Sequence, residues 1–567
     1  MNRQMYSKSI LRDYRFFLVV LIGILLIVSV WTTSVLWIEP TDLGLAGKLP
    51  VVYWIGFALV GILWFAGKDS HYWLFAALVF TFAYLYFAPA IIRATPWISN
   101  SYYPFGESLL INSSGHLEYR PTIFVSYHDW PIFLYLASAL TLVTGIPNNV
   151  LLTYFPVFTV FLYCLLSVLI LRTKLKLSWA YVGAAWVLGS FFIRQQYFGP
   201  QAIAYVFFLI ILLLTIWIFF DDRGNKRSFI GLLLFLSIVT TFTHPLTSLM
   251  VVFLIFAVYL TYRLVLGQSV STLSRLFLLL GAVWFGYNMY VARTFFSTTF
   301  EHLSELLFGE RELNLYSESS RIVGSTAMEL NFLSSWVIVI VGAGIALISV
   351  FLIFRALQKN PNDRLMGFSF FMVFSLVLFG IFAFVGEYGA HESYQRAFMF
   401  ALIPVSYLCV TFLSKKPKLL IVVLVALLFL NIPAQYGADT YRLATDSQLA
   451  GSKFIADNSD ESFSMLGKFN LYIRYYDPLK RIDVLPLGID FPYTNYNSTA
   501  VVEAIDEALN RSDFIVTSGL QTNFYVYFLG FDPLDEVAFQ DKCNLIYDNG
   551  RFQIYVPLNF TSQELVN

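Results

Sequence analysis

The chain alternates between long apolar runs and short polar connections from its start to residue 432. A helix needs roughly 20 mostly apolar residues to cross the ~30 Å hydrocarbon core of a bilayer. The pattern therefore predicts about 13 transmembrane helices and an all-α polytopic membrane domain over residues 1–432. The predicted helices lie at 16–37, 51–66, 71–92, 150–171, 178–193, 202–220, 228–242, 246–262, 273–291, 332–354, 365–385, 397–413 and 419–432.

One apolar run, 132–146, is left out of this count because its roughly 15 residues are too few to span. It closes a polar, aromatic-rich loop over residues 93–147. We expect it to form a helix against the membrane face, with the acids and histidines that precede it at the boundary between lipid and water.

The orientation follows from lysine and arginine in the short connections, which mark the cytoplasmic side. With 132–146 excluded, the basic clusters fall on the same side as Arg3, Lys8, Arg12 and Arg15. We predict a multi-pass protein of the cell membrane with a cytoplasmic N-terminus, outer loops at 93–147 and 293–331, and an extracytoplasmic C-terminal region. The later basic clusters are Arg172, Lys174 and Lys176; Arg223, Lys226 and Arg227; Arg263 and Arg275; Arg355, Lys359 and Arg364; and Lys415, Lys416 and Lys418.

Residues 433–567 have the size and pattern of a separate small α/β domain. Strands are predicted at 463–466, 481–485, 513–517, 543–547 and 552–555, and helices at 447–458, 499–510 and 522–529. Asp548-Asn549-Gly550 is typical of a hairpin turn. Since no glycine-rich phosphate loop or nucleophile elbow is found there, we expect this domain to serve recognition or assembly and to hold no catalytic group.

Composition supports a membrane protein, because 58% of the residues are hydrophobic and 13% are charged, against about 25% charged in soluble chains. The formal net charge is zero, so no basic field points to nucleic acid. The three cysteines indicate neither a disulfide framework nor a zinc site.

Polar residues gather where the predicted spans end on the outer side. Ionisable groups at membrane depth are unfavourable, so their presence at this rim suggests a water-accessible cavity. Helix capping by His244 and an ion pair between Glu387 and Arg396 are the structural alternatives. The rim residues are Arg194, Gln201, His244, Glu387, His391 and Arg396.

Three stretches, 102–116, 127–131 and 198–201, resemble the GT-C superfamily of polytopic glycosyltransferases, whose sugar donors are lipid phosphates. The stretch 243–248 resembles uncharacterised, largely archaeal membrane proteins of this general type, and the similarity covers roughly residues 70–430. The family's first acid follows the span closely, where this chain has Ser99, Asn100 and Ser101, and the stretch 194–201 has no acid. Glu107, Glu118 and Asp129 are the acids available instead.

The resemblance implies transfer of a sugar from a polyprenyl-phosphate donor to a glycan or protein acceptor on the outer face of the membrane. A carboxylate would act as general base, with Asp129 as first choice and Glu107 as second; Asp129 would alternatively be only a helix N-cap. An arginine (Arg120, Arg194 or Arg396) would hold the phosphate. The other substrate-binding candidates are Tyr102, Tyr103, His116, His128, Gln201, His244, Glu387 and His391.

Three points stay open at this stage. A divalent metal is compatible with such a site, but no ligand set has recognisable spacing. An envelope polysaccharide polymerase or ligase would use similar residues. A membrane transporter would be expected to show internal repeats, which are not evident.

Overall fold

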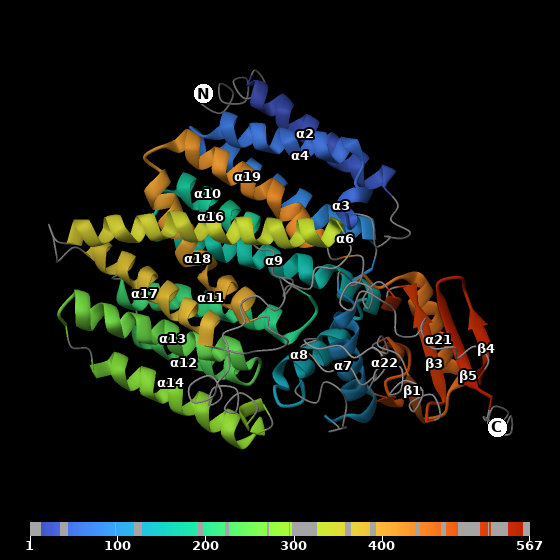
Figure 1. Cartoon of the computed structure of the whole chain (residues 1–567). Helices are drawn as coiled ribbons and strands as arrows, with labels where there is room; N and C mark the ends of the chain where they lie inside the picture. The colour runs from blue at the N-terminus through green and yellow to red at the C-terminus, as the bar shows by residue number, and fades with distance from the viewer. Residues whose placement is uncertain are drawn as a thin grey trace.

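The computed structural model describes residues 13–33, 43–93, 95–96, 98–117, 127–190, 197–221, 226–268, 271–293, 295–297, 326–357, 364–385, 393–437, 439, 443–466, 472–485, 511–519, 521–522 and 542–558. Long helices form the larger part, and a five-stranded sheet lies near the C-terminus (Figure 1). This is the predicted fold class: an all-α membrane domain followed by a small α/β region.

Each of the thirteen predicted apolar runs contains a helix. These helices are α2 (Tyr14–Thr32), α4 (Val51–Gly67), the continuous α5 (His71–Phe82), η1 (Ala83–Phe87) and α6 (Ala88–Arg93), α9 (Asn148–Arg172), α10 (Leu177–Ser190), α11 (Pro200–Phe219), α12 (Lys226–Thr241), α13 (Pro245–Leu260) with η4 (Thr261–Val265), α14 (Ser271–Tyr290), α16 (Thr326–Leu357), α17 (Arg364–Val385), α18 (Ser393–Leu413) and α19 (Pro417–Tyr436).

Among the described residues, 8 helices are long and apolar enough to cross a membrane. They are α2, α5 to α6, α9, α11, α13 with η4, α16, α18 and α19. The multi-pass character is thus confirmed by length and composition, while the number thirteen for the spans stays a prediction.

The connection between α6 and α9 differs from the expected loop. It holds α8 (Ile132–Thr144), the predicted short helix, and also α7 (Tyr102–Ser114), which was not predicted. The 13 residues of α8 extend about 20 Å at 1.5 Å per residue, which is too short to span. Gly145 ends α8 with a left-handed φ of 62°, a conformation that glycine adopts without a steric penalty.

The α8 helix has apolar side chains on two faces. Phe133, Leu134 and Ala137 are buried in a cluster shared with α7, while Leu142 and Val143 are exposed, Val143 by 84%. A helix with one apolar face packed and another exposed is suited to a boundary with lipid.

The C-terminal region contains α21 (Asp446–Asn458), α22 (Ile473–Tyr476) and the strands β1 (Ser462–Leu466), β2 (Arg481–Leu485), β3 (Phe514–Ser518), β4 (Cys543–Asp548) and β5 (Phe552–Pro557). The sheet order is β2-β1-β3-β5-β4, with β2, β1 and β3 parallel and the other pairs antiparallel. The helix predicted at 447–458, the five strands and the hairpin turn are confirmed. The helices predicted at 499–510 and 522–529 lie wholly or largely outside the described residues.

The short helices α7, α8 and α22 lie between the ends of the long helices and the sheet (Figure 1). Tyr102, Phe105, Phe133 and Phe198 form a buried cluster here with Tyr472 of the C-terminal region. The segment after the last long helix is thus packed directly on the α6–α9 connection.

Candidate functional site

Glu107 lies on the buried side of α7, where the carboxylate has no solvent exposure. Its Oε2 is 2.9 Å from Nε2 of His128, and its Oε1 accepts a hydrogen bond from Nη1 of Arg474. Burial raises the pKa of a carboxyl group, but the bond with His128 and the charge of Arg474 outweigh it and lower the pKa of Glu107 below its usual value. Glu107 is therefore ionised and engaged through both oxygens.

Arg474 belongs to α22, in the C-terminal region that was expected to serve recognition or assembly and to hold no catalytic group. Its side chain is 6% exposed, and it lies 367 positions from Glu107 in the sequence. No spacing or local pattern in the sequence indicates a partnership over such a separation. Arg474 is therefore a candidate site residue that sequence reasoning missed.

Close packing fixes α22 against α7. The ring of Tyr102 meets the rings of Tyr472 and Tyr475 edge-on, with centroids 4.9 and 5.1 Å apart. Gly106 allows the backbones to approach, because a Cβ at this position would lie 2.9 Å from the Cβ of Arg474. The ion pair is thus part of a packed contact.

A second buried ion pair joins the end of α6 to the segment that follows α19. Arg93, the last residue of α6, donates to Asp439, which follows α19, and both side chains are almost fully buried. The guanidinium of Arg93 also lies over the ring of Tyr436, 4.7 Å from its centroid. A buried charge requires such partners, since an unpaired one is strongly unfavourable.

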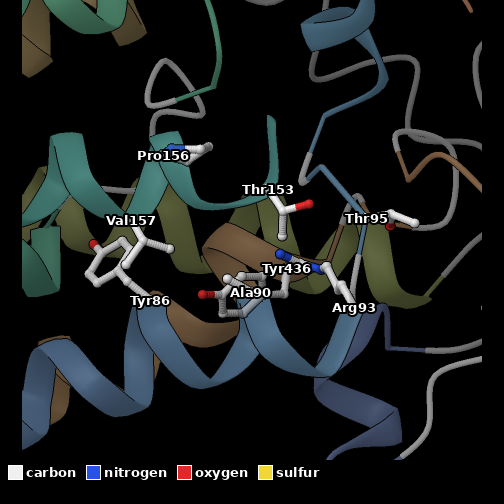
Figure 2. A pocket seen from close by; sticks show the side chains of 8 residues that line it. All are labelled: Tyr86, Ala90, Arg93, Thr95, Thr153, Pro156, Val157 and Tyr436. Carbon is white, nitrogen blue, oxygen red and sulfur yellow. The ribbon is translucent and has the colours of Figure 1, made fainter. Parts of the chain in front are cut away.

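Arg93 and Tyr436 also line a small pocket with Tyr86, Ala90, Thr95, Thr153, Pro156 and Val157 (Figure 2). In Figure 2, Thr153 and Pro156 of α9 lie opposite Ala90 and Arg93 of α6. The cavity is ≈ 10 Å³, which is room for about one water molecule. In this conformation the pocket is too small for a sugar or a lipid phosphate.

Asp129 lies in the turn that precedes α8 and is partly buried. Burial raises the pKa of its carboxyl group above its usual value, and the neighbouring His128 opposes the shift. The expected N-cap geometry is not found, since Pro131 holds the N-cap position and no side chain there bonds to the helix. The capping alternative for Asp129 is therefore wrong.

The turn 127–131 is attached to the ends of the long helices. The hydroxyl of Tyr287 on α14 donates to the backbone oxygen of Asp129. The backbone N–H of Ile132 donates to the carbonyl of Phe242, at the end of α12, over 3.4 Å. Trp130 is buried and meets the ring of Phe295 edge-on at 5.2 Å. These contacts hold the turn that carries Asp129 against the helix ends.

His244 and Arg396 lie on neighbouring helix ends. His244 is the N-cap of α13, where its Nδ1 accepts from the backbone N–H of Thr247 over 3.3 Å. This is the capping contact considered from the sequence. Arg396 on α18 donates to Oε1 of Gln201 on α11 over 3.0 Å.

The remaining predicted residues divide into three groups. Tyr102 and Tyr103 are buried, Tyr102 against α22 and Tyr103 beside Tyr127, with ring centroids 5.4 Å apart. His116 is exposed after α7, and its Nδ1 is 2.9 Å from the carbonyl of Ser114, so it lies away from the buried groups. Arg120, Arg194, Glu387, His391 and the alternative acid Glu118 lie outside the described residues.

A metal site is not formed by the residues that the structure describes. Within them, no group of three or more His, Cys, Asp or Glu side chains could hold an ion. The three cysteines, Cys164, Cys409 and Cys543, are buried free thiols.

The solved structures similar to this chain include two membrane proteins of known identity. The oligosaccharyltransferase of Archaeoglobus fulgidus, in complex with Zn and sulfate, is 14% identical with a TM-score of 0.45, over 81% of this chain and 70% of that chain. ArnT from Cupriavidus metallidurans, bound to undecaprenyl phosphate, is 12% identical with a TM-score of 0.46, over 85% of this chain and 97% of that chain. A scan against protein-family models and a search of curated proteins gave no match. At these identities the likeness is one of fold alone and says nothing of the chemistry of this chain.

Proposed function

We propose that this protein is a membrane glycosyltransferase that moves a sugar from a polyprenyl-phosphate donor to a glycan or protein acceptor. The observation that carries the proposal is the environment of Asp129. Asp129 is partly buried, its carboxyl group has a raised pKa, and it belongs to a turn whose backbone bonds to Tyr287 on α14 and to Phe242 at the end of α12. A general base is most effective when its pKa is moved toward the working pH. The donor class comes from the sequence resemblance.

The reaction needs a base and a group that stabilises the phosphate. The Asp129 carboxylate takes the proton from the acceptor hydroxyl or amide as the acceptor atom bonds to the anomeric carbon. The bond between that carbon and the phosphate oxygen breaks, and polyprenyl phosphate leaves with the electron pair. Of the three arginines expected to hold the phosphate, Arg396 is the one among the described residues, and a guanidinium can bond to two phosphate oxygens.

Glu107 is the weaker candidate for the base. A base must reach the acceptor, whereas Glu107 has no exposed surface and both of its oxygens are engaged. The pKa of Glu107 is lowered, whereas that of Asp129 is raised, and both shifts favour Asp129 as the proton acceptor. We therefore assign Asp129 to proton transfer and Glu107 to support.

The test is sugar release from labelled polyprenyl-phosphate donors by the full chain in purified membranes. Wild type should transfer label to an acceptor fraction and D129N should not, while D457N changes an exposed aspartate of α21 and should transfer normally. Folded wild type that releases no label from any donor tested, while its proteoliposomes take up a solute, would refute the proposal in favour of a transporter.

We also propose the predicted orientation, with the short helices and the C-terminal region outside the cell, and a boundary between the two domains near residue 432. The basic connection after α9 would then be cytoplasmic. Lys176 is exposed there, whereas Lys174 bonds to Asp221 over 3.0 Å. A cysteine replacing Lys176 should react with an impermeant maleimide only after the cells are opened. The three native thiols are buried, so they should add no background labelling. Reaction in intact cells would contradict this orientation.

A further inference from the structure

We propose that Arg474 of the C-terminal region is a positioning residue for Asp129, acting through Glu107 and His128. The inference rests on the proposed function and deepens it, because it makes the C-terminal region part of the same site. It replaces the expectation that this region serves recognition or assembly alone.

The first step is a continuous connection from α22 to the turn. Arg474 donates to Oε1 of Glu107, and Oε2 of Glu107 is 2.9 Å from Nε2 of His128. His128 is joined to Asp129 by a peptide bond. A displacement of the Arg474 guanidinium is therefore transmitted through two side-chain contacts to the residue beside the base.

The second step is that the side chains of this connection are buried from solvent. The side chains of Arg474, Glu107 and His128 are 6%, 0% and 1% exposed. Hydrogen bonds to an ionised carboxylate are stronger and more directional where water is excluded. Their geometry therefore restrains the side chains more than a surface ion pair would.

The third step is that each end of the connection is anchored. Arg474 is held where the backbone of α22 meets Gly106, and the rings of Tyr472 and Tyr475 pack on Tyr102. At the other end, the backbone oxygen of Asp129 accepts from Tyr287, and Ile132 bonds to Phe242. The turn thus lies between the C-terminal region and the long helices, and both determine its position.

The variants separate positioning from simple support of the fold. R474Q removes the charge while it keeps a polar side chain, and R474K restores the charge without the planar fork. K453Q is the matched control, because it removes the positive member of an exposed ion pair with Asp457 in the same region. All are measured as the full chain in nanodiscs.

The first readout is hydrogen exchange of the backbone amides of Trp130 and Ile132. We expect R474Q to raise their exchange rates about tenfold while the amides of β5 are unchanged, with partial recovery in R474K and no change in K453Q. Unchanged exchange at the turn in folded R474Q would overturn the inference. This readout does not depend on transfer activity, so it decides the inference even where the proposed function fails.

The second readout is transfer kinetics with a polyprenyl-phosphate sugar. Since small misplacement of a reacting group lowers the rate by one to two orders of magnitude, R474Q should lower kcat about tenfold or more with KM nearly unchanged. An increase in KM alone would show that Arg474 binds substrate, which contradicts a positioning role. If R474Q does not fold, the double variant E107Q/R474Q leaves no unpaired charge, and it should show the same rise in exchange and fall in kcat. Wild-type exchange and kcat in that variant would overturn the inference.

Discussion

Two described carboxylates of the connection between α6 and α9 lie in contrasting surroundings. Glu107 on α7 is fully buried, bound by His128 and Arg474, and has a lowered pKa. Asp129, in the turn before α8, is partly buried and has a raised pKa. The same segment thus supplies two carboxylates with different properties. That of Glu107 is paired with buried side chains, and that of Asp129 is able to take a proton.

The contrast follows from what each element packs against. The face of α7 that carries Glu107 meets α22, so its carboxylate is enclosed by the C-terminal region. The turn with Asp129 meets the ends of α12 and α14 through backbone groups, which leaves its carboxylate out of those contacts. In the proposed mechanism, proton transfer and structural support are therefore divided between neighbouring parts of one connection.

The largest expected effect is on catalysis by D129N. Asparagine is nearly isosteric with aspartate but does not accept the proton, so kcat should fall about 10²- to 10⁴-fold. The melting temperature should stay close to that of wild type, because the carboxylate has no capping role. Full activity of folded D129N in the donor assay would contradict the assignment of proton transfer to Asp129.

The second effect is on stability, from E107A. This change leaves Arg474 buried without its partner, and breaking a buried pair destabilises a protein by about 3–5 kcal/mol. We expect a large fall in the free energy of unfolding, measured by denaturant titration of the full chain in detergent. D129N is the matched control in the same experiment. A loss no larger than that of D129N would contradict the supporting role of Glu107.

The third effect is a difference in pH dependence. Glu107 has a folded pKa below its usual 4.5, so its stabilising contribution is present above that pH and is lost as the pH falls through the folded value. Asp129 has a pKa above its usual 3.8, so the transfer rate should rise with pH through that higher value.

Rate and melting temperature measured across the acid range test this difference. Because the pKa of Asp129 lies above 3.8 and that of Glu107 lies below 4.5, we expect the rate to have its midpoint above pH 3.8 and the stability to be lost below pH 4.5. A rate midpoint below pH 3.8, or a loss of stability with its midpoint above pH 4.5, would contradict the comparison.

The smallest expected effect is from G106A, which tests the packing that encloses Glu107. The added Cβ would lie 2.9 Å from the Cβ of Arg474, so α7 and α22 must separate. Overpacking of this kind destabilises by about 1–3 kcal/mol. Gly231 in α12 has open space around it, and G231A should be neutral or slightly stabilising, since alanine favours helix. Equal melting temperatures for G106A and G231A would show that α7 and α22 can move apart at Gly106 without loss of stability.

The sequence by itself determined the elements that depend on local composition. Long apolar runs specify helices because backbone groups in lipid must bond within their own segment, and α8 is short because its apolar run is short. The β4–β5 hairpin follows from the Asp548-Asn549-Gly550 turn, where Gly550 has a φ of 84°.

The tertiary structure alone decided what surrounds each polar group. The α7 helix carries Pro104, Gly106 and aromatic residues that are typical of a loop, and its burial against α22 and α8 favours the helix over its local propensity. The pairs Arg93–Asp439 and Glu107–Arg474 join residues 346 and 367 positions apart. No periodicity encodes such pairs, because they form only when the C-terminal region packs on the α6–α9 connection and removes both charges from water.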